Sequence, residues 1–191
     1  RIGSLRYSGS FAGIIKDFTA KGLIETTIGN IRTDLNLKFP DGKPEQYKGE
    51  IEVFSFNTGK LLNNGLFGTS TLFTVVDGEG FTLEDLNTKL LGNVQSFEYD
   101  GYNYTNATFD GVLEKGLFNG KFDVADPNVN LSFNGMVNMT KNNPGGDFKA
   151  KLGVVNFAKL GYGDINVKNI DNVNITFEGL DIDDMKIDAI L

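Results

Sequence analysis

Apolar and polar residues alternate with a period of two along most of the chain. Leu35, Leu37 and Phe39 fall on one parity of their segment, and charged or amide side chains fall on the other. Segments that alternate in the same way are 129–134, 148–154 and 173–177. This periodicity is typical of strands with one apolar face and one hydrated face. It predicts an all-β protein of about a dozen antiparallel strands.

Turn residues separate these segments, and helical signals are scarce. The clearest turns are expected at 40–42, 77–80, 126–128 and 142–146. A change of parity at 53–56 predicts a β-bulge, and Gly120 and Gly135 inside strand patterns predict bulges or bends. Asn57 and Asn156 are suited to cap short helices near residues 57–62 and 156–160. We therefore expect helices of one or two turns only.

The chain repeats itself once, at a separation of 99 residues. The segment 56–62 is similar to 155–161, and 80–86 is similar to 179–185 at the same offset. Two matches at one offset are harder to obtain by chance than one, and self-similarity is typical of stacked repeats. We therefore expect two repeats, 1–99 and 100–191, in one continuous body. Stacked repeats present long surfaces rather than single pockets.

Histidine, cysteine and tryptophan are all absent. The missing histidines remove the commonest general base and metal ligand. The missing cysteines remove thiol nucleophiles, zinc–thiolate sites and disulfides. A net charge of −7 argues against nucleic acid and anionic membrane surfaces as partners. The composition therefore removes the commonest catalytic and metal-binding side chains, and we expect a protein that is not an enzyme and that holds no cofactor and no metal.

The two ends of the sequence resemble cut ends. The chain opens on Arg1, without a leader pattern, and it ends on Leu191 inside an apolar pattern. We expect an excerpt from a longer chain. No apolar run approaches the ~20 residues of a membrane-spanning helix. If the whole protein is anchored in a membrane, the anchor lies in segments outside this excerpt.

Five strings occur in an order and spacing that carry a family resemblance. They are LRYSG at 5–9, GNIRTDL at 29–35, TGKLL at 58–62, FEYDGYNY at 97–104, and the long segment 118–135. Together they resemble the TamB-like proteins of Bacteroidota, within the wider AsmA-like family. The resemblance covers most of the chain and weakens after Gly161. Each segment alone has a composition that is common in β-strands, whereas the five segments in this order are more specific for the family.

The resemblance implies an elongated, curled antiparallel sheet, called a β-taco or repeating β-groove, with an apolar inner groove. It implies a periplasmic location, within an envelope protein that is anchored in the inner membrane. In the family, the groove is thought to carry lipid between the two membranes or to support outer-membrane protein assembly. The implied partners are phospholipid acyl chains and the outer-membrane assembly machinery. The family offers no catalytic motif to transfer.

The residues expected to line the groove share the apolar parity of their strands. They are Leu35, Leu37, Phe39, Ile51, Val53, Phe122, Val124, Leu131, Phe133, Phe148, Leu152, Val173, Ile175 and Phe177. The same pattern is compatible with a structural or adhesive extracellular β-sandwich or solenoid module, in which these side chains fill a sealed core. An outer-membrane β-barrel is a further alternative, which the lack of tryptophan disfavours because such barrels carry aromatic girdles.

Two sets of acidic residues and one aromatic stretch are further candidate sites. The acidic cluster consists of Asp181, Asp183, Asp184 and Asp188. Its spacing lacks the glycine and the distal glutamate of a calcium loop, which favours a solvated turn. Glycoside hydrolysis requires a pair of carboxylates, and the candidates on polar strand faces are Glu25, Asp34, Glu50 and Glu52, among which nothing singles out a pair.

The aromatic stretch contains Phe97, Tyr99, Tyr102 and Tyr104. It is compatible with a carbohydrate-stacking platform. Cross-strand packing at a sheet edge is the interpretation that such density favours.

Overall fold

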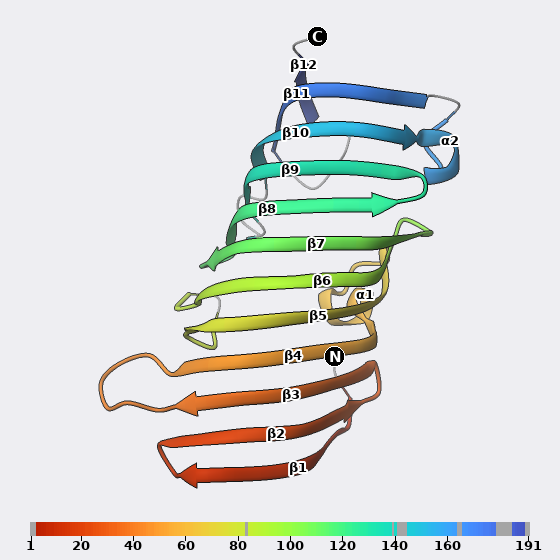
Figure 1. Ribbon diagram of the computed structural model, residues 1–191. Coiled ribbons are helices and arrows are strands. Elements are labelled where there is room, and N and C mark those ends of the chain that lie inside the picture. The colour runs from red at the N-terminus through yellow and green to blue at the C-terminus, as the bar shows by residue number, and fades with distance from the viewer. Residues whose placement is uncertain are drawn as a thin grey trace.

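The protein forms one antiparallel sheet of twelve strands, in which neighbours in sequence are also neighbours in space (Figure 1). The computed structural model describes residues 3–82, 84–138, 140, 145–163, 166–178 and 185–189, and of residues 166–168, 171, 172, 177 and 185–189 it describes the backbone. The strands are β1 (Leu5–Ile14), β2 (Asp17–Thr26), β3 (Gly29–Lys38), β4 (Gln46–Asn57), β5 (Phe67–Glu79), β6 (Asn87–Tyr99), β7 (Tyr102–Glu114), β8 (Leu117–Asp126), β9 (Val129–Asn138), β10 (Gly145–Asn156), β11 (Asn166–Glu178) and β12 (Met185–Ala189). Strands make up most of the residues that the structure describes and the sheet is not closed, which confirms the all-β prediction.

Two short helices interrupt the succession of strands, at the places that the sequence predicts. Helix α1 (Thr58–Leu62) follows β4, and α2 (Phe157–Leu160) follows β10. The side-chain oxygen of Asn57 accepts a hydrogen bond from the backbone N–H of Lys60 at 2.8 Å, and Asn156 accepts one from Lys159 at 3.2 Å. These caps satisfy backbone donors that a first helical turn leaves unpaired.

The element boundaries follow the 99-residue spacing. Strands β4 and β10 begin and end 99 positions apart, and so do β5 and β11. Each half of the chain places a helical turn between its fourth and fifth strands. The predicted division between residues 99 and 100 falls in the turn between β6 and β7, which pair with each other, so the sheet crosses this point without a break. That 1–99 and 100–191 are two repeats of one unit stays a prediction.

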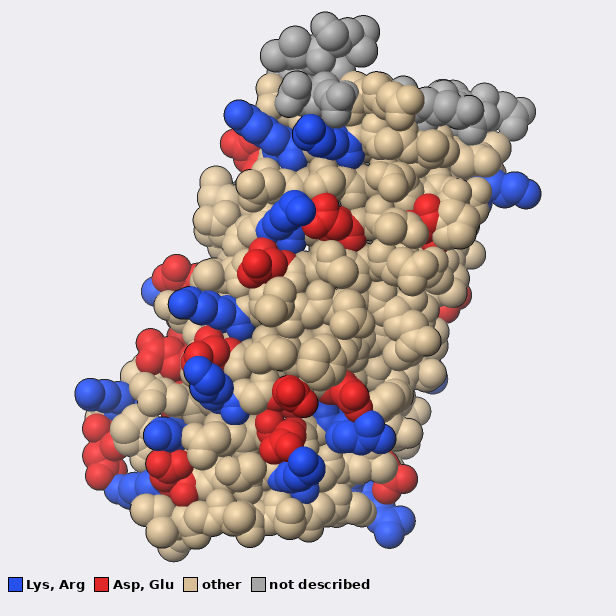
Figure 2. Space-filling view, in the orientation of Figure 1, with Lys and Arg blue, Asp and Glu red and all other residues tan. Residues whose placement is uncertain are grey.

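The two faces of the sheet differ in polarity, because residues opposite each other in an antiparallel pair share a face. We name the face that carries Leu35 and Leu131 the apolar face, and the face that carries Asp34 and Lys121 the charged face. Cross-strand ion pairs lie on the charged face, such as Lys21 with Asp34 at 2.5 Å. Figure 2 shows basic and acidic side chains interspersed on the surface turned to the viewer. Because such pairs are exposed, each adds little to stability.

A β-bulge in β4 occurs where the parity of the sequence changes. The register between β4 and β5 shifts between Val53 and Phe56, and Ser55 has a φ of 45°. The shift confirms the predicted bulge. It returns Phe56 to the apolar face, where its side chain is buried. The last residues of β4 therefore lead into α1 with Phe56 on the apolar face, while Phe54 stays on the charged face beneath the guanidinium of Arg32.

Three glycines lie side by side where the strands bend. Gly111, Gly120 and Gly135 are opposite one another on β7, β8 and β9. A Cβ atom on Gly120 would lie 2.3 Å from the carbonyl oxygen of Asp110, which leaves no room for a side chain. In Figure 1 the ends of β8 and β9 that contain these glycines curve away from the straight part of the sheet. The close backbone approach permits this bend.

Few apolar side chains of the described residues are fully buried, because no second sheet covers the apolar face in the described part of the chain. The buried apolar residues are Ala20, Ile28, Phe56, Val76, Ala107, Val124, Val129, Ala150, Val155, Leu160 and Val173. Most other apolar residues of this face are half-buried. The sheet therefore has a thin core, concentrated near α2.

Candidate functional site: an apolar cavity beneath the first helix

Strand register places the residues predicted to line a groove on the apolar face. Leu131 lies opposite Val124 and Leu152, and Phe133 lies opposite Phe122 on β8. The rings of Phe122 and Phe133 stack with their centroids 5.4 Å apart. The second half of the chain thus gathers a continuous apolar strip across three strands.

The remaining predicted residues extend this face toward both edges of the sheet. Leu35 and Leu37 continue it on β3, Ile51 and Val53 on β4, Phe148 on β10, and Val173 and Ile175 on β11, as the strand pairings show. Phe39 follows β3, and its ring stacks on Phe18 with centroids 5.9 Å apart. Phe177 pairs through its backbone with Gly146, and its side chain lies outside the described atoms. A role in lining a lipid groove stays a prediction for all of these residues.

A cavity of about 710 Å³ opens on the apolar face, between α1 and strands β3–β9. Four of the predicted residues line it, namely Val53, Phe122, Val124 and Leu131. The sequence prediction missed the lining residues on β5 and β6, such as Leu72 and Val94. Register shifts between β5 and β6 interrupt the alternation there and hide the apolar parity.

The lining of this cavity carries no charge at neutral pH. It contains no aspartate, glutamate, lysine or arginine. The hydroxyls of Thr58 and Ser70 are hydrogen-bonded to each other at 2.7 Å. Burial, and then the neighbouring Tyr102 and Tyr99, raise the pKa of the Tyr104 hydroxyl above its ordinary value, so it stays protonated. Such a lining suits an uncharged, apolar ligand.

Helix α1 forms one end of the cavity and is held close to β5. A Cβ atom on Gly59 would lie 1.9 Å from the carbonyl oxygen of Phe67, so only glycine permits this contact. The position of α1 sets Leu61 on the cavity wall, where 46% of its surface remains exposed. The adjacent Leu62 is 54% exposed and does not line the cavity.

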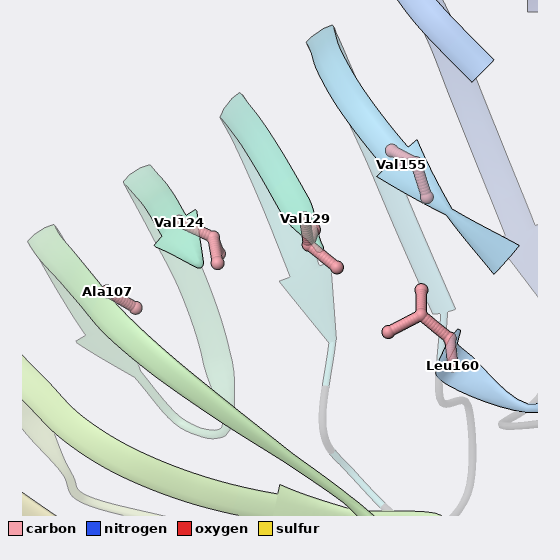
Figure 3. Packing of buried hydrophobic residues seen from close by; sticks show 5 residues of the cluster. All are labelled: Ala107, Val124, Val129, Val155 and Leu160. Carbon is pink, nitrogen blue, oxygen red and sulfur yellow. The ribbon is translucent and has the colours of Figure 1, made fainter. Parts of the chain in front are cut away.

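A packed cluster beneath α2 forms the other end. Leu160 of α2 belongs to one cluster with Ala107, Val124, Val129 and Val155 of β7 to β10, and all five are buried (Figure 3). Ala107, Val124 and Val129 also line the cavity. The cavity therefore ends at this cluster.

A buried carboxylate fixes the strand ends next to this cluster. Asp126 accepts hydrogen bonds from the Tyr102 hydroxyl at 2.6 Å, from the Thr105 hydroxyl at 2.8 Å and from the Thr105 N–H at 3.0 Å. It also accepts one from the Asn128 N–H at 2.8 Å. Burial disfavours the charged form of Asp126, but these bonds together outweigh burial and hold its pKa below the ordinary value.

The aromatic stretch at the β6–β7 turn packs across neighbouring strands. Tyr99 lies opposite Tyr102, and the rings of Tyr102 and Tyr104 meet edge to face with centroids 4.7 Å apart. The Tyr162 hydroxyl, beyond α2, donates a hydrogen bond to Asp100 in this turn at 3.1 Å. Burial and this bond raise the pKa of Tyr162 to about 12. These contacts favour packing over a stacking platform for carbohydrate.

The carboxylates considered for glycoside chemistry lie on the charged face, away from the cavity. Asp34 is opposite Glu50 but pairs with Lys21, and Glu25 pairs with Arg6 at 3.8 Å. Glu52 pairs with Arg32. These contacts give the carboxylates structural partners on neighbouring strands.

The described residues contain no group of three histidine, cysteine or acidic side chains placed to hold a metal ion. Of the acidic cluster near the C-terminus, Asp181, Asp183 and Asp184 lie outside the described residues. Asp188 is described only by its backbone in β12.

Comparisons of the chain with protein-family models, with curated proteins and with solved structures find no match. Within the residues that the structure describes, neither helix has the length and apolar character needed to cross a membrane.

Proposed function

We propose that this chain is a non-enzymatic segment of a TamB-like, AsmA-like bridge protein in the periplasm. In this proposal the sheet is curled into a β-taco, and its apolar face is the inner wall of a groove. The groove carries lipid between the inner and outer membranes or supports outer-membrane protein assembly. The observation that carries the proposal is the neutral cavity of about 710 Å³ on an apolar face that is largely half-buried.

The chemistry of the apolar face suits acyl chains. A hydrocarbon tail needs exclusion from water, which stabilises it by about 0.8 kcal/mol per buried CH₂ group, and it needs no precisely placed polar partner. The chain contains 16 phenylalanines and no tryptophan, so its aromatic wall carries few polar atoms. Apolar surface that a protein leaves partly exposed commonly marks a binding site.

Partial exposure also favours an open groove over a sealed structural module. In a sealed module, Leu37, Phe133 and Phe148 would lie in a closed core, whereas here they are half-buried. The bend at Gly120 and Gly135 lets the sheet curve around a ligand without closing on itself. An adhesive module would not need a neutral cavity of this size.

Introducing a charge into the groove tests the proposal. Leu37→Asp, Leu131→Asp and Phe133→Asp are each expected to block lipid passage while leaving a folded protein. A half-exposed carboxylate can be hydrated in the empty groove, but it presents a barrier to an apolar tail. In cells, photo-crosslinking groups at positions 37, 131 and 133 are expected to yield lipid adducts. Urea unfolding of each aspartate variant checks that it folds.

The matched control is Asn134→Asp, which adds a carboxylate next to Phe133 on the charged face. It is expected to change neither lipid passage nor stability. A lack of lipid adducts at all three positions, together with unfolding of all three aspartate variants, would refute the groove and restore the sealed module.

A further inference from the structure

We infer that the cavity beneath α1 is a discrete binding site for one acyl tail of a long-chain amphiphile, and not simply a stretch of uniform groove. The inference rests on the proposed function and adds to it a fixed position and a ligand class. The two halves of the chain form the same elements, but the space beside the helix is filled by a side chain in the second half and is open in the first half.

Leu61 of α1 and Leu160 of α2 occupy equivalent positions, 99 residues apart. Leu160 is buried, with 7% of its surface exposed, because it packs into the cluster on β7 to β10. Leu61 is 46% exposed and stands on the wall of the cavity. The second half thus fills this space with its own side chain, and the first half leaves it for a ligand.

Both ends of the site are fixed, which limits how much ligand it can hold. At one end, Gly59 lets α1 lie against β5, and the Thr58–Ser70 hydrogen bond joins the two elements. At the other end, the bond from Tyr162 to Asp100 ties the segment after α2 to the β6–β7 turn. The cavity, which is open on one side, has a volume of about 710 Å³, within the range of roughly 300–1,000 Å³ that is typical of small-molecule sites.

The absence of charge from the lining identifies the part of the ligand that enters. A charged headgroup would lose its hydration in the cavity without gaining a partner of opposite charge. A hydrocarbon tail gives up no favourable hydration when it enters the cavity, and it gains contacts with Val94, Phe97 and Leu131. The tail therefore lies inside the cavity and the headgroup stays in water.

The test is a binding titration of the chain with cis-parinaric acid, a fluorescent long-chain fatty acid. We expect saturable binding of one molecule per chain. Val94→Trp fills the cavity with an indole ring and is expected to weaken binding at least about tenfold. The matched control, Leu91→Trp, places the same ring on the charged face of the same strand, where Leu91 is 57% exposed, and it should bind as the native chain does.

A second pair of variants tests the site without relying on how the introduced tryptophan side chain packs in the cavity. Leu61→Ala removes part of the cavity wall and is expected to weaken binding about fivefold, while Leu62→Ala on the same helix leaves it unchanged. Both leucines are substantially exposed, so both variants are expected to fold.

The outcomes separate this inference from the proposed function. Binding of several probe molecules per chain, unaffected by Val94→Trp and Leu61→Ala, would overturn the discrete site and leave the groove intact. One-to-one binding that neither substitution weakens would place the site elsewhere and also overturn the inference. No binding, together with no lipid adducts in cells, would overturn both proposals.

Discussion

Replacing Asp126 by alanine is expected to lower the free energy of unfolding by about 3–5 kcal/mol. The substitution removes the acceptor of four hydrogen bonds and leaves the donors of Tyr102, Thr105 and Asn128 without it at a buried site. Urea unfolding, followed by circular dichroism, measures the loss. Asp123→Ala is the matched control, because Asp123 faces outward and pairs with the exposed Lys121 at 2.8 Å. It should cost less than about 1 kcal/mol. Equal losses for the two variants would contradict the role given to Asp126.

The same carboxylate predicts how stability depends on pH. The pKa of Asp126 is lowered in the folded protein, relative to an ordinary value of 3.8. The folded state therefore binds the proton less readily than the unfolded state, and the contribution of Asp126 is complete above the unfolded pKa. It is lost as the pH falls from about 4 through the folded pKa. Between pH 7 and pH 3, the native chain should lose more stability than Asp126→Ala does.

The second large effect is expected at the bend. Gly120→Val is expected to destabilise the protein by about 3 kcal/mol, because its Cβ would collide with the backbone of β7. Relief of the clash requires the strands to separate, which breaks sheet hydrogen bonds next to Gly111. Thermal unfolding measures the effect. Asn119→Val is the control, since it puts the same side chain on the exposed face of the same strand. A Gly120→Val protein as stable as this control would show that the bend tolerates a side chain.

The sequence predicted most of the fold because alternation, turns and caps are local properties. The strands, the bulge near Ser55 and the turns capped by Asn57 and Asn156 all depend on residues close together in the chain. The apolar parity also identified four residues of the cavity wall. Local patterns of this kind do not depend on how the distant parts of the chain pack.

The remaining parts of the site depend on contacts that no local pattern reveals. Asp126 belongs to a stretch with the composition of a turn, yet it is buried because Tyr102 reaches it from β7. The two leucines Leu61 and Leu160 occupy similar strings, and only the packing of α2 makes one buried and the other exposed. Periodicity assigns a residue to a face, but it does not decide whether another element covers that face.

The uninterrupted strand order has a mechanical consequence in the proposed role as a bridge between two membranes. In the part of the chain that the structure describes, each strand pairs only with the strands before and after it in sequence. A force that pulls the ends of the chain apart would act perpendicular to the strands. It would break the hydrogen bonds of one edge strand at a time. The contacts broken at each step are local, so each peeled strand can pair again quickly once the tension falls. Such a sheet would unfold strand by strand under force and refold when the force is removed. A β-sandwich, in which strands distant in sequence pair with each other, would instead unfold in one cooperative step.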